Sequence, residues 1–166
     1  MSLPTRPVAH AAIESAWGQV IHDRVLAASG CDVHSVNTDS IGTTPAQLDL
    51  DTAGTDPGGF LDAANDQIVI PTDKQGLYLI NLIIQAVNGA TTTETRGYIY
   101  VNGSSIIHAI EDNEGGTNIA VGITALKYLS AGDIVQAWAQ KRGTGTNPTC
   151  HVASMQLLRV TDDYGA

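Results

Sequence analysis

The chain has 166 residues, of which 43% are hydrophobic, which is enough for one globular domain with a short appendage. Its net charge of −9, from 8 basic and 17 acidic residues, repels phosphate backbones and argues against a nucleic-acid-binding function. No apolar run reaches the roughly 20 residues that a membrane-spanning helix requires, and the opening residues lack the features of a secretory signal. We therefore expect no membrane insertion, and synthesis in a cytoplasm without export by that route.

Residues 1–30 are predicted to form an arm and a helix that are distinct from the rest of the chain. Pro4 and Pro7 favour an extended start, and an apolar stripe at helical spacing follows, with Gly30 as its C-terminal stop. The stripe consists of Ile13, Trp17, Val20, Ile21 and Val25. A single helix of this length must pack on its own domain, on copies in an oligomer or on another protein, and these alternatives stay open. An anchoring role for the helix is one of them.

Residues 31–60 are polar, with scattered strand signals. The stretch 40–51 ends in clean alternation, with Leu48 and Leu50 set against polar neighbours, so the first strand is predicted there. Residues 52–59 are a loop by composition. Cys31 and Cys150 are too few for a disulfide scaffold, and the sequence favours buried free thiols without excluding one bridge between them.

The stretch 76–87 is apolar on both faces when it is read at period two. One face carries Leu77, Leu79, Asn81, Ile83, Gln85 and Val87, and the other carries Tyr78, Ile80, Leu82, Ile84 and Ala86. An antiparallel strand with one wet face alternates apolar and polar residues, which this stretch does not. We therefore expect a central strand that is covered by a second sheet on one side and by another subunit on the other.

The remaining pattern predicts short antiparallel strands separated by Gly, Asn or Pro. The expected ranges are 66–71, 95–101, 105–110, 118–126, 134–140 and 150–160. Asn102-Gly103 is the strongest hairpin signal in the chain. About eight to ten strands after one N-terminal amphipathic α-helix predict an all-β protein, with a jelly-roll β-sandwich head domain at 31–166.

Several landmarks stand in an order that resembles the trimeric jelly rolls of tumour necrosis factor and the complement globular heads. They are Ile68-Val-Ile-Pro71, Gly76-Leu-Tyr78, Tyr98-Ile-Tyr-Val-Asn-Gly103, Leu126-Lys-Tyr-Leu-Ser-Ala-Gly-Asp-Ile-Val135 and Ala153-Ser-Met-Gln-Leu-Leu158. The resemblance covers about residues 40–160. It implies a homotrimer in which the inner sheets meet along a threefold axis, and this would account for the doubly apolar central strand.

The opening of the chain is similar to the openings of small structural proteins of tailed bacteriophages. The similarity rests on Leu3-Pro-Thr-Arg-Pro-Val8 followed by the Ala-rich helix Ile13-Glu-Ser-Ala-Trp-Gly18. It implies a virion protein of the head, tail or fibre, made in the host cytoplasm and attached to other virion proteins through its N-terminal segment. Such a trimer would decorate the particle or bind a cell-surface glycan. The alternative is a soluble bacterial jelly-roll module that binds sugar or calcium.

The sequence contains no catalytic or cofactor-binding motif that predicts an enzyme. Nucleophile-elbow, phosphate-loop and zinc-protease spacings are absent, and the five histidines are dispersed. We therefore expect no enzymatic activity, no catalytic residues and no bound cofactor. Glu111, Asp112 and Glu114 could ligate Ca²⁺ through hard oxygens, but they lack the alternating spacing of a calcium loop, and a solvated loop is the favoured interpretation.

Aromatic and aliphatic residues on the predicted strands are candidates for the core or for the trimer interface. These candidates are Tyr78, Ile80, Leu82, Ile84, Tyr98, Tyr100 and Trp138. Aromatic side chains on strands mostly lie in cores or interfaces, although the last three would stack on sugars if they were exposed.

Overall fold

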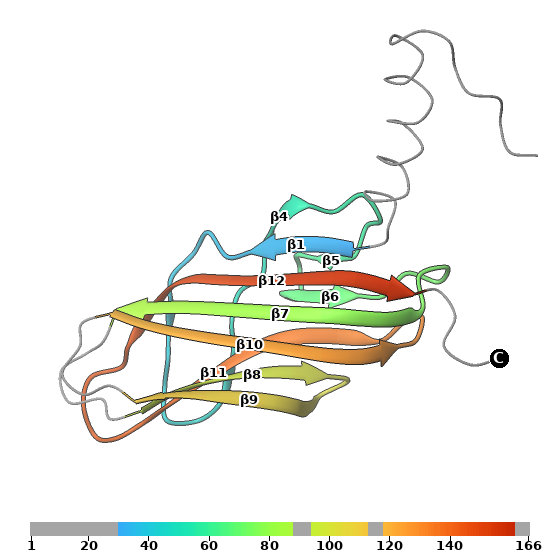
Figure 1. Ribbon diagram of the computed structural model, residues 1–166. Coiled ribbons are helices and arrows are strands. Elements are labelled where there is room, and N and C mark those ends of the chain that lie inside the picture. The colour runs from blue at the N-terminus through green and yellow to red at the C-terminus, as the bar shows by residue number, and fades with distance from the viewer. Residues whose placement is uncertain (1–29, 88–93, 113–117, 162–166) are drawn as a thin grey trace, which may run out of the picture.

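The computed structural model describes residues 30–87, 94–112 and 118–161 as two packed antiparallel sheets of six strands each (Figure 1). The N-terminal arm and helix expected within 1–30 lie outside the described residues except for Gly30, which belongs to a strand and not to a helix end. Within the described ranges no helix is long and apolar enough to cross a membrane. The all-β sandwich expected from the strand pattern is therefore confirmed for this part of the chain.

Sheet A runs in the order β10-β7-β12-β1-β4, and β2 also pairs with β12. Its strands are β1 (Gly30–His34), β2 (Asp39–Ser40), β4 (Thr52–Thr55), β7 (Gly76–Val87), β10 (Asn118–Leu129) and β12 (Thr149–Thr161). The long strands β7, β10 and β12 lie side by side, because β7 pairs with each of the other two along almost its whole length.

Sheet B runs in the order β5-β6-β11-β8-β9, and β3 also pairs with β11. Its strands are β3 (Ala46–Gln47), β5 (Leu61–Asp62), β6 (Gln67–Val69), β8 (Glu94–Val101), β9 (Ser104–Asp112) and β11 (Ile134–Arg142). From β6 onward the chain changes sheet at most connections, as in a jelly roll. The hairpin between β8 and β9 turns at Asn102-Gly103 with φ values of 51° and 76°, as the sequence predicts.

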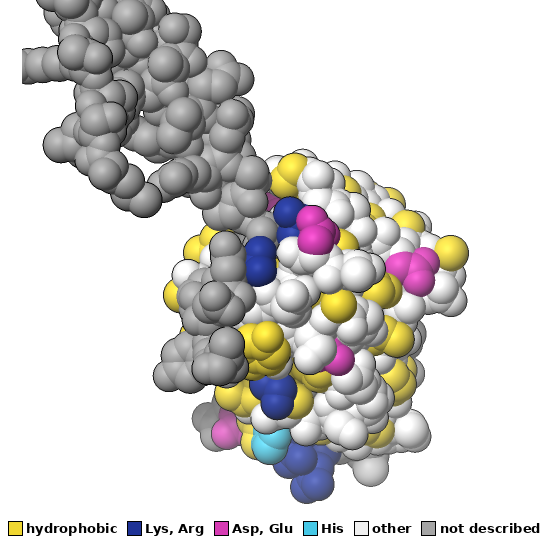
Figure 2. Space-filling model, turned by 90° about the vertical axis from the view of Figure 1, so that its right-hand side faces the viewer, with side chains coloured by type: hydrophobic (Ala, Val, Ile, Leu, Met, Phe, Trp, Pro, Cys, Tyr) yellow, Lys and Arg dark blue, Asp and Glu magenta, His cyan; other side chains and the backbone are white. Residues whose placement is uncertain are grey.

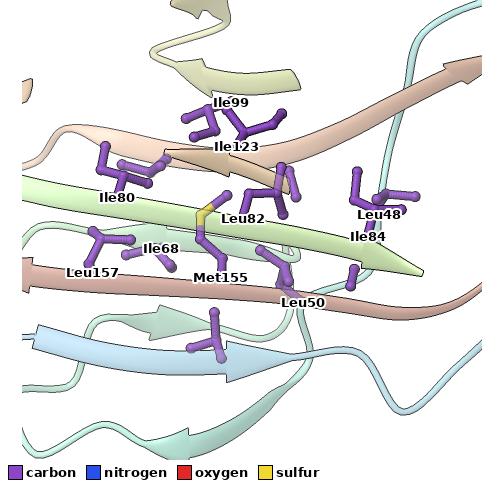
Figure 3. Packing of buried hydrophobic residues seen from close by; sticks show 14 of the residues in the cluster. Leu48, Leu50, Ile68, Ile80, Leu82, Ile84, Ile99, Ile123, Met155 and Leu157 are labelled. Carbon is purple, nitrogen blue, oxygen red and sulfur yellow. The ribbon is translucent and has the colours of Figure 1, made fainter. Parts of the chain in front are cut away.

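The hydrophobic core lies between the two sheets. Tyr78, Ile80, Leu82 and Ile84 of β7 are completely buried, and Figure 3 shows side chains from β7, β12 and the opposite layer pointing toward one another. The sheets pack tightly at Gly97 of β8, where an added Cβ would lie 2.8 Å from Cδ1 of Ile84. One face of β7 is thus accounted for by the second sheet.

The cysteines are free and buried, in separate parts of sheet A. Cys31 lies on β1 and Cys150 near the start of β12. Burial raises the pKa of each thiol to about 12, with a smaller contribution from nearby aspartates. The structure therefore supports free thiols rather than a bridge between these two residues.

The structure corrects the sequence interpretation between residues 30 and 60. The first strand of the described chain is β1, not the 40–51 stretch. Within that stretch, only Ser40, at the end of β2, and Ala46–Gln47, which form β3, belong to strands. Leu48 and Leu50 are buried without belonging to a strand. Their alternation with polar residues therefore reflects burial in the core and not strand formation. The expected loop at 52–59 contains β4, because β1 offers Thr52–Thr55 a pairing edge that composition does not reveal.

Candidate functional site

The outward side of β7, β10 and β12 is a large apolar surface, which we name the uncharged face. The described part of the chain exposes eleven large hydrophobic side chains, and eight of them lie on these three strands. The eight are Leu79, Ile83, Val87, Leu126, Tyr128, Val152, Leu158 and Val160. A monomeric protein seldom leaves an apolar patch of this kind in water, so the face has the character of an interaction surface.

The register of the strands places three of these apolar residues in one row across the sheet. Leu126 of β10 lies opposite Leu79 of β7, which in turn lies opposite Leu158 of β12. These three side chains are 60%, 38% and 50% exposed. The next pair toward the strand end, Tyr128 and Leu77, extends the apolar row.

Charge is nearly absent from these strands although the chain as a whole is strongly acidic. The described stretches of β7, β10 and β12 contain no Asp or Glu, and their two basic residues are Lys127 and Arg159. Both pair with the buried Tyr78 and therefore belong to the opposite side of the sheet. Figure 2 views the end of the sandwich on the right of Figure 1, where acidic and basic side chains do reach the surface. Depletion of charge is typical of the centre of a protein interface.

One polar row crosses the uncharged face. Thr124, Asn81 and Gln156 lie opposite one another on β10, β7 and β12, and Asp32 of β1 continues the row toward the sheet edge. The Thr124 hydroxyl donates a hydrogen bond to Oδ1 of Asn81 over 3.2 Å. Such a row restricts how a second apolar surface can be placed on this face, because each polar group requires a partner.

A shallow hollow of about 360 Å³ lies at the far end of the same strands. It is lined by Gln85, Ala86, Val87, Asn118, Ile119, Ala120 and His151. Its lining carries one titratable group, the imidazole of His151. We assign no separate chemistry to this hollow.

The outward side of sheet B carries a second grouping, which we name the aromatic–amide face. It consists of Tyr98, Tyr100, Trp138, Gln47, Gln136 and Gln140, all half-buried. Gln47, Trp138 and Tyr98 lie opposite one another on β3, β11 and β8, and His108 of β9 ends the row. The intervening residues of β8 and β11 are buried, so this row points away from the core.

The rings of the aromatic–amide face pack against one another. Tyr100 and Trp138 are stacked with centroids 4.8 Å apart and an interplanar angle of 22°. Tyr98 lies edge-on to Tyr100 at 6.1 Å, and its hydroxyl donates to Oε1 of Gln140 over 2.7 Å. These contacts hold the rings in fixed positions while part of each remains at the surface.

The candidate residues from the sequence thus fall into three separate places. Tyr78, Ile80, Leu82 and Ile84 lie in the core, whereas Tyr98, Tyr100 and Trp138 belong neither to the core nor to the uncharged face. The helix candidates Ile13, Trp17, Val20, Ile21 and Val25 lie outside the described residues. The alternation of 76–87 had separated the two faces of β7 correctly, but which face is free depends on the position of sheet B.

Two of the three calcium candidates lie at an end of sheet B. Glu111 and Asp112 are exposed residues at the end of β9, not members of a loop, and Glu114 is outside the described residues. Within the described ranges no three His, Cys, Asp or Glu side chains are grouped closely enough to hold a metal ion.

Comparison with solved structures identifies the fold. The chain superposes on the tumour necrosis factor protein Eiger of S. frugiperda with a TM-score of 0.61 and 11% identity, covering 82% of this chain and 95% of that one. The globular domain of zebrafish complement 1qA gives 0.60 and 12%, covering 81% and 99%. Murine APRIL gives 0.55 and 14%, covering 80% and 100%.

The protein therefore has the jelly-roll fold of the tumour necrosis factor and complement globular-head domains. At these identities the similarity establishes the architecture, and the function has to be argued from the two faces. No protein-family model and no curated protein matches the sequence.

Proposed function

We propose that this protein is a non-enzymatic, self-associating structural or binding module, and that copies associate through the uncharged face. The observation that carries the proposal is the gathering of eight exposed large hydrophobic side chains on three adjacent strands with no acidic residue. Burial of each such side chain contributes about 1.5–3 kcal/mol, so even partial covering of the row through Leu79 provides a substantial driving force.

The proposed assembly is a closed homotrimer. A closed ring covers the apolar face of every copy and leaves no unpaired surface from which an open fibre could grow. Three is the number implied by the resemblance to the tumour necrosis factor and complement jelly rolls, and the fold agrees with that resemblance. The central strand β7 then has one face on sheet B and the other on neighbouring subunits, which explains its two apolar sides.

The biological setting that we propose is a bacteriophage particle. The support comes from the resemblance of residues 3–8 and 13–18 to the openings of small phage structural proteins and from the missing catalytic motifs. In this setting residues 1–30 would attach the trimer to the capsid or tail, and the head would decorate the particle or bind a host-surface ligand. A soluble bacterial binding module is the competing function, and it would not require self-association.

The molecular mass in solution tests the proposal. Light scattering from the full chain at micromolar concentration is expected to give three times the 17.3 kDa mass of one chain. Leu126→Lys, which places a charge in the centre of the apolar row, is expected to lower the mass to that of one chain while the circular dichroism spectrum remains that of a folded β protein.

Ile110→Lys is the matched control. Ile110 is a large hydrophobic residue that is 46% exposed, and it lies on β9 of sheet B, the sheet opposite the uncharged face. This variant should keep the mass of the wild-type chain. A wild-type chain that scatters as a monomer would refute the assembly and leave the monomeric binding module as the better function.

A further inference from the structure

We infer that the aromatic–amide face of sheet B binds a neutral carbohydrate. Tyr100 and Trp138 offer a stacked pair of rings on which the C–H groups of a pyranose can pack. Gln47, Gln136 and Gln140 surround the rings with amide oxygens that can accept from sugar hydroxyl groups, while the amide N–H groups of Gln47 and Gln136 already donate within the protein. A small-ligand site is usually composed of an aromatic or apolar surface with a small number of polar groups around it.

The amide groups have fixed orientations before any ligand arrives. Nε2 of Gln136 donates to Oε1 of Gln47 over 3.1 Å, and Oε1 of Gln136 accepts from the indole N–H of Trp138 over 3.3 Å. Nε2 of Gln140 donates to the carbonyl of Thr43 over 2.7 Å. Each amide oxygen keeps a second lone pair for a ligand hydroxyl, and a preformed arrangement lowers the entropic cost of binding.

The charges around this face favour a neutral ligand over an acidic one. The aromatic and amide groups carry no charge, and the Arg96 guanidinium beside Tyr98 is paired with Glu94. The chain has a net charge of −9, which disfavours uronic-acid or sialic-acid polymers at physiological ionic strength. A protein partner would be expected to need a larger apolar centre than these half-buried rings provide.

This inference deepens the proposed function and rests on it for valency alone. The aromatic–amide face lies on sheet B and the uncharged face on sheet A, so self-association leaves the sugar site open. A trimer would present three copies of the site. Several weak sites on one particle strengthen attachment to a surface polymer without any new contact.

The test follows chemical shifts of the isotope-labelled full chain during titration with single sugars. The probes are the methyl glycosides of glucose, galactose, mannose and N-acetylglucosamine. At least one is expected to give a saturable response in the millimolar range, confined to the Trp138 indole and the side-chain amides of Gln47, Gln136 and Gln140. Trp17→Phe leaves Trp138 as the single tryptophan, so its fluorescence should report the same binding curve.

Two tyrosine variants locate the site. Tyr100→Ala removes one stacked ring and should weaken binding of the responding sugar about tenfold or more. Tyr128→Ala makes the same change on the uncharged face and should leave the affinity unchanged. The shift map on the wild-type chain decides the question even if Tyr100→Ala fails to fold.

Three results would overturn the inference: no saturable response to any of the four glycosides, a response that maps elsewhere, or a response that folded Tyr100→Ala retains in full. The result is independent of the mass measurement. A monomer that binds sugar at Trp138 would refute self-association alone, and a trimer without a sugar response would refute the sugar site alone.

Discussion

Thr124 donates a hydrogen bond to the side-chain oxygen of Asn81 across the β10–β7 pair, at 3.2 Å, in the middle of the uncharged face. Asn81 is flanked along β7 by Leu79 and Ile83, both exposed. A polar group in this position adds nothing to hydrophobic association. It can instead select one arrangement of subunits, because arrangements that leave the amide unpaired are penalised.

Asn81→Leu should therefore strengthen association and reduce its specificity. We expect the free energy of association to become more favourable by about 1–3 kcal/mol per subunit, since an apolar side chain replaces an amide in the covered surface. We also expect more than one oligomeric species in sedimentation velocity, where the wild type gives one. The precedent for this behaviour is the buried asparagine that sets register in coiled coils.

Asn118→Leu is the control for this prediction. Asn118 is an exposed residue at the start of β10, at the end of the face, where it pairs with Val87. The same substitution there should leave the species distribution unchanged. A single, unchanged species in Asn81→Leu would show that the polar row does not select the assembly.

Two sequence landmarks of the fold are joined by hydrogen bonds. Oδ1 of Asp133, in the turn before β11, accepts from the side-chain amide of Asn102 at 2.9 Å, and Oδ2 accepts from the backbone N–H of Ser130 at 2.8 Å. Oδ1 of Asn102 accepts in turn from the backbone N–H of Ile134. The Asn-Gly turn of the β8–β9 hairpin is thereby fixed to the Gly-Asp turn.

Asp133→Ala should lower the free energy of unfolding by about 1–3 kcal/mol, because two donors lose their acceptor. Urea denaturation at fixed chain concentration measures the change. Asp73→Ala serves as the control, since Asp73 is largely exposed and forms one long contact with Lys74, at 3.7 Å. It should change the stability by less than about 0.5 kcal/mol. Equal effects of the two substitutions would contradict the role assigned to Asp133.

The long strands could be predicted from the sequence because their residues carry the evidence locally. Strand β7 begins and ends where its apolar run and preceding turn place it, at Gly76 and Val87. Strand β1 is missing from the predicted strands, although its five residues, Gly30–His34, do alternate, with Cys31 and Val33 set between more polar positions. It is a strand because β12 and β4 offer pairing partners on both sides, and such partners are distant in sequence.

The two faces illustrate the same limit. The alternation in the sequence assigns Leu79 and Ile80 to opposite faces of β7, but the position of sheet B decides which of the two faces is exposed. The pairing of Trp138 with Tyr98 and Gln47 likewise depends on the β3–β11–β8 register, which joins segments tens of residues apart. Composition identifies the aromatic residues as candidates, and only the register makes them one surface.

Asp39 and Asp62 provide a pair of pH predictions with opposite signs. Partial burial raises the pKa of Asp39 above its ordinary value, and the neighbouring Asp49 carboxylate raises it further, although the backbone N–H of Asp49 partly offsets both. The side chains of Asn65 and Gln67 donate hydrogen bonds to Asp62 and lower its pKa. Ionisation of Asp39 therefore destabilises the folded state, and ionisation of Asp62 stabilises it.

The sign of each effect follows from linkage between protonation and folding. The pKa of Asp39 is raised in the folded state, so its protonated form stabilises the fold. This stability is complete below the unfolded pKa of about 3.9 and is lost as the pH rises through the folded pKa. Asp39→Asn removes this loss and should raise Tm at neutral pH by no more than about 2–4 °C. The difference from wild type should vanish at about pH 3, where Asp39 is protonated.

Asp62→Asn should behave in the opposite way. Its lowered pKa means that the carboxylate stabilises the fold above the unfolded pKa and that this stability is lost as the pH falls through the folded value. The variant should therefore have a lower Tm than wild type at neutral pH, and the gap should close in acid. Differential scanning calorimetry of both variants between about pH 3 and pH 7 makes the comparison. Shifts of the same sign in both variants would contradict these electrostatic environments, since a general effect of removing negative charge would raise both Tm values.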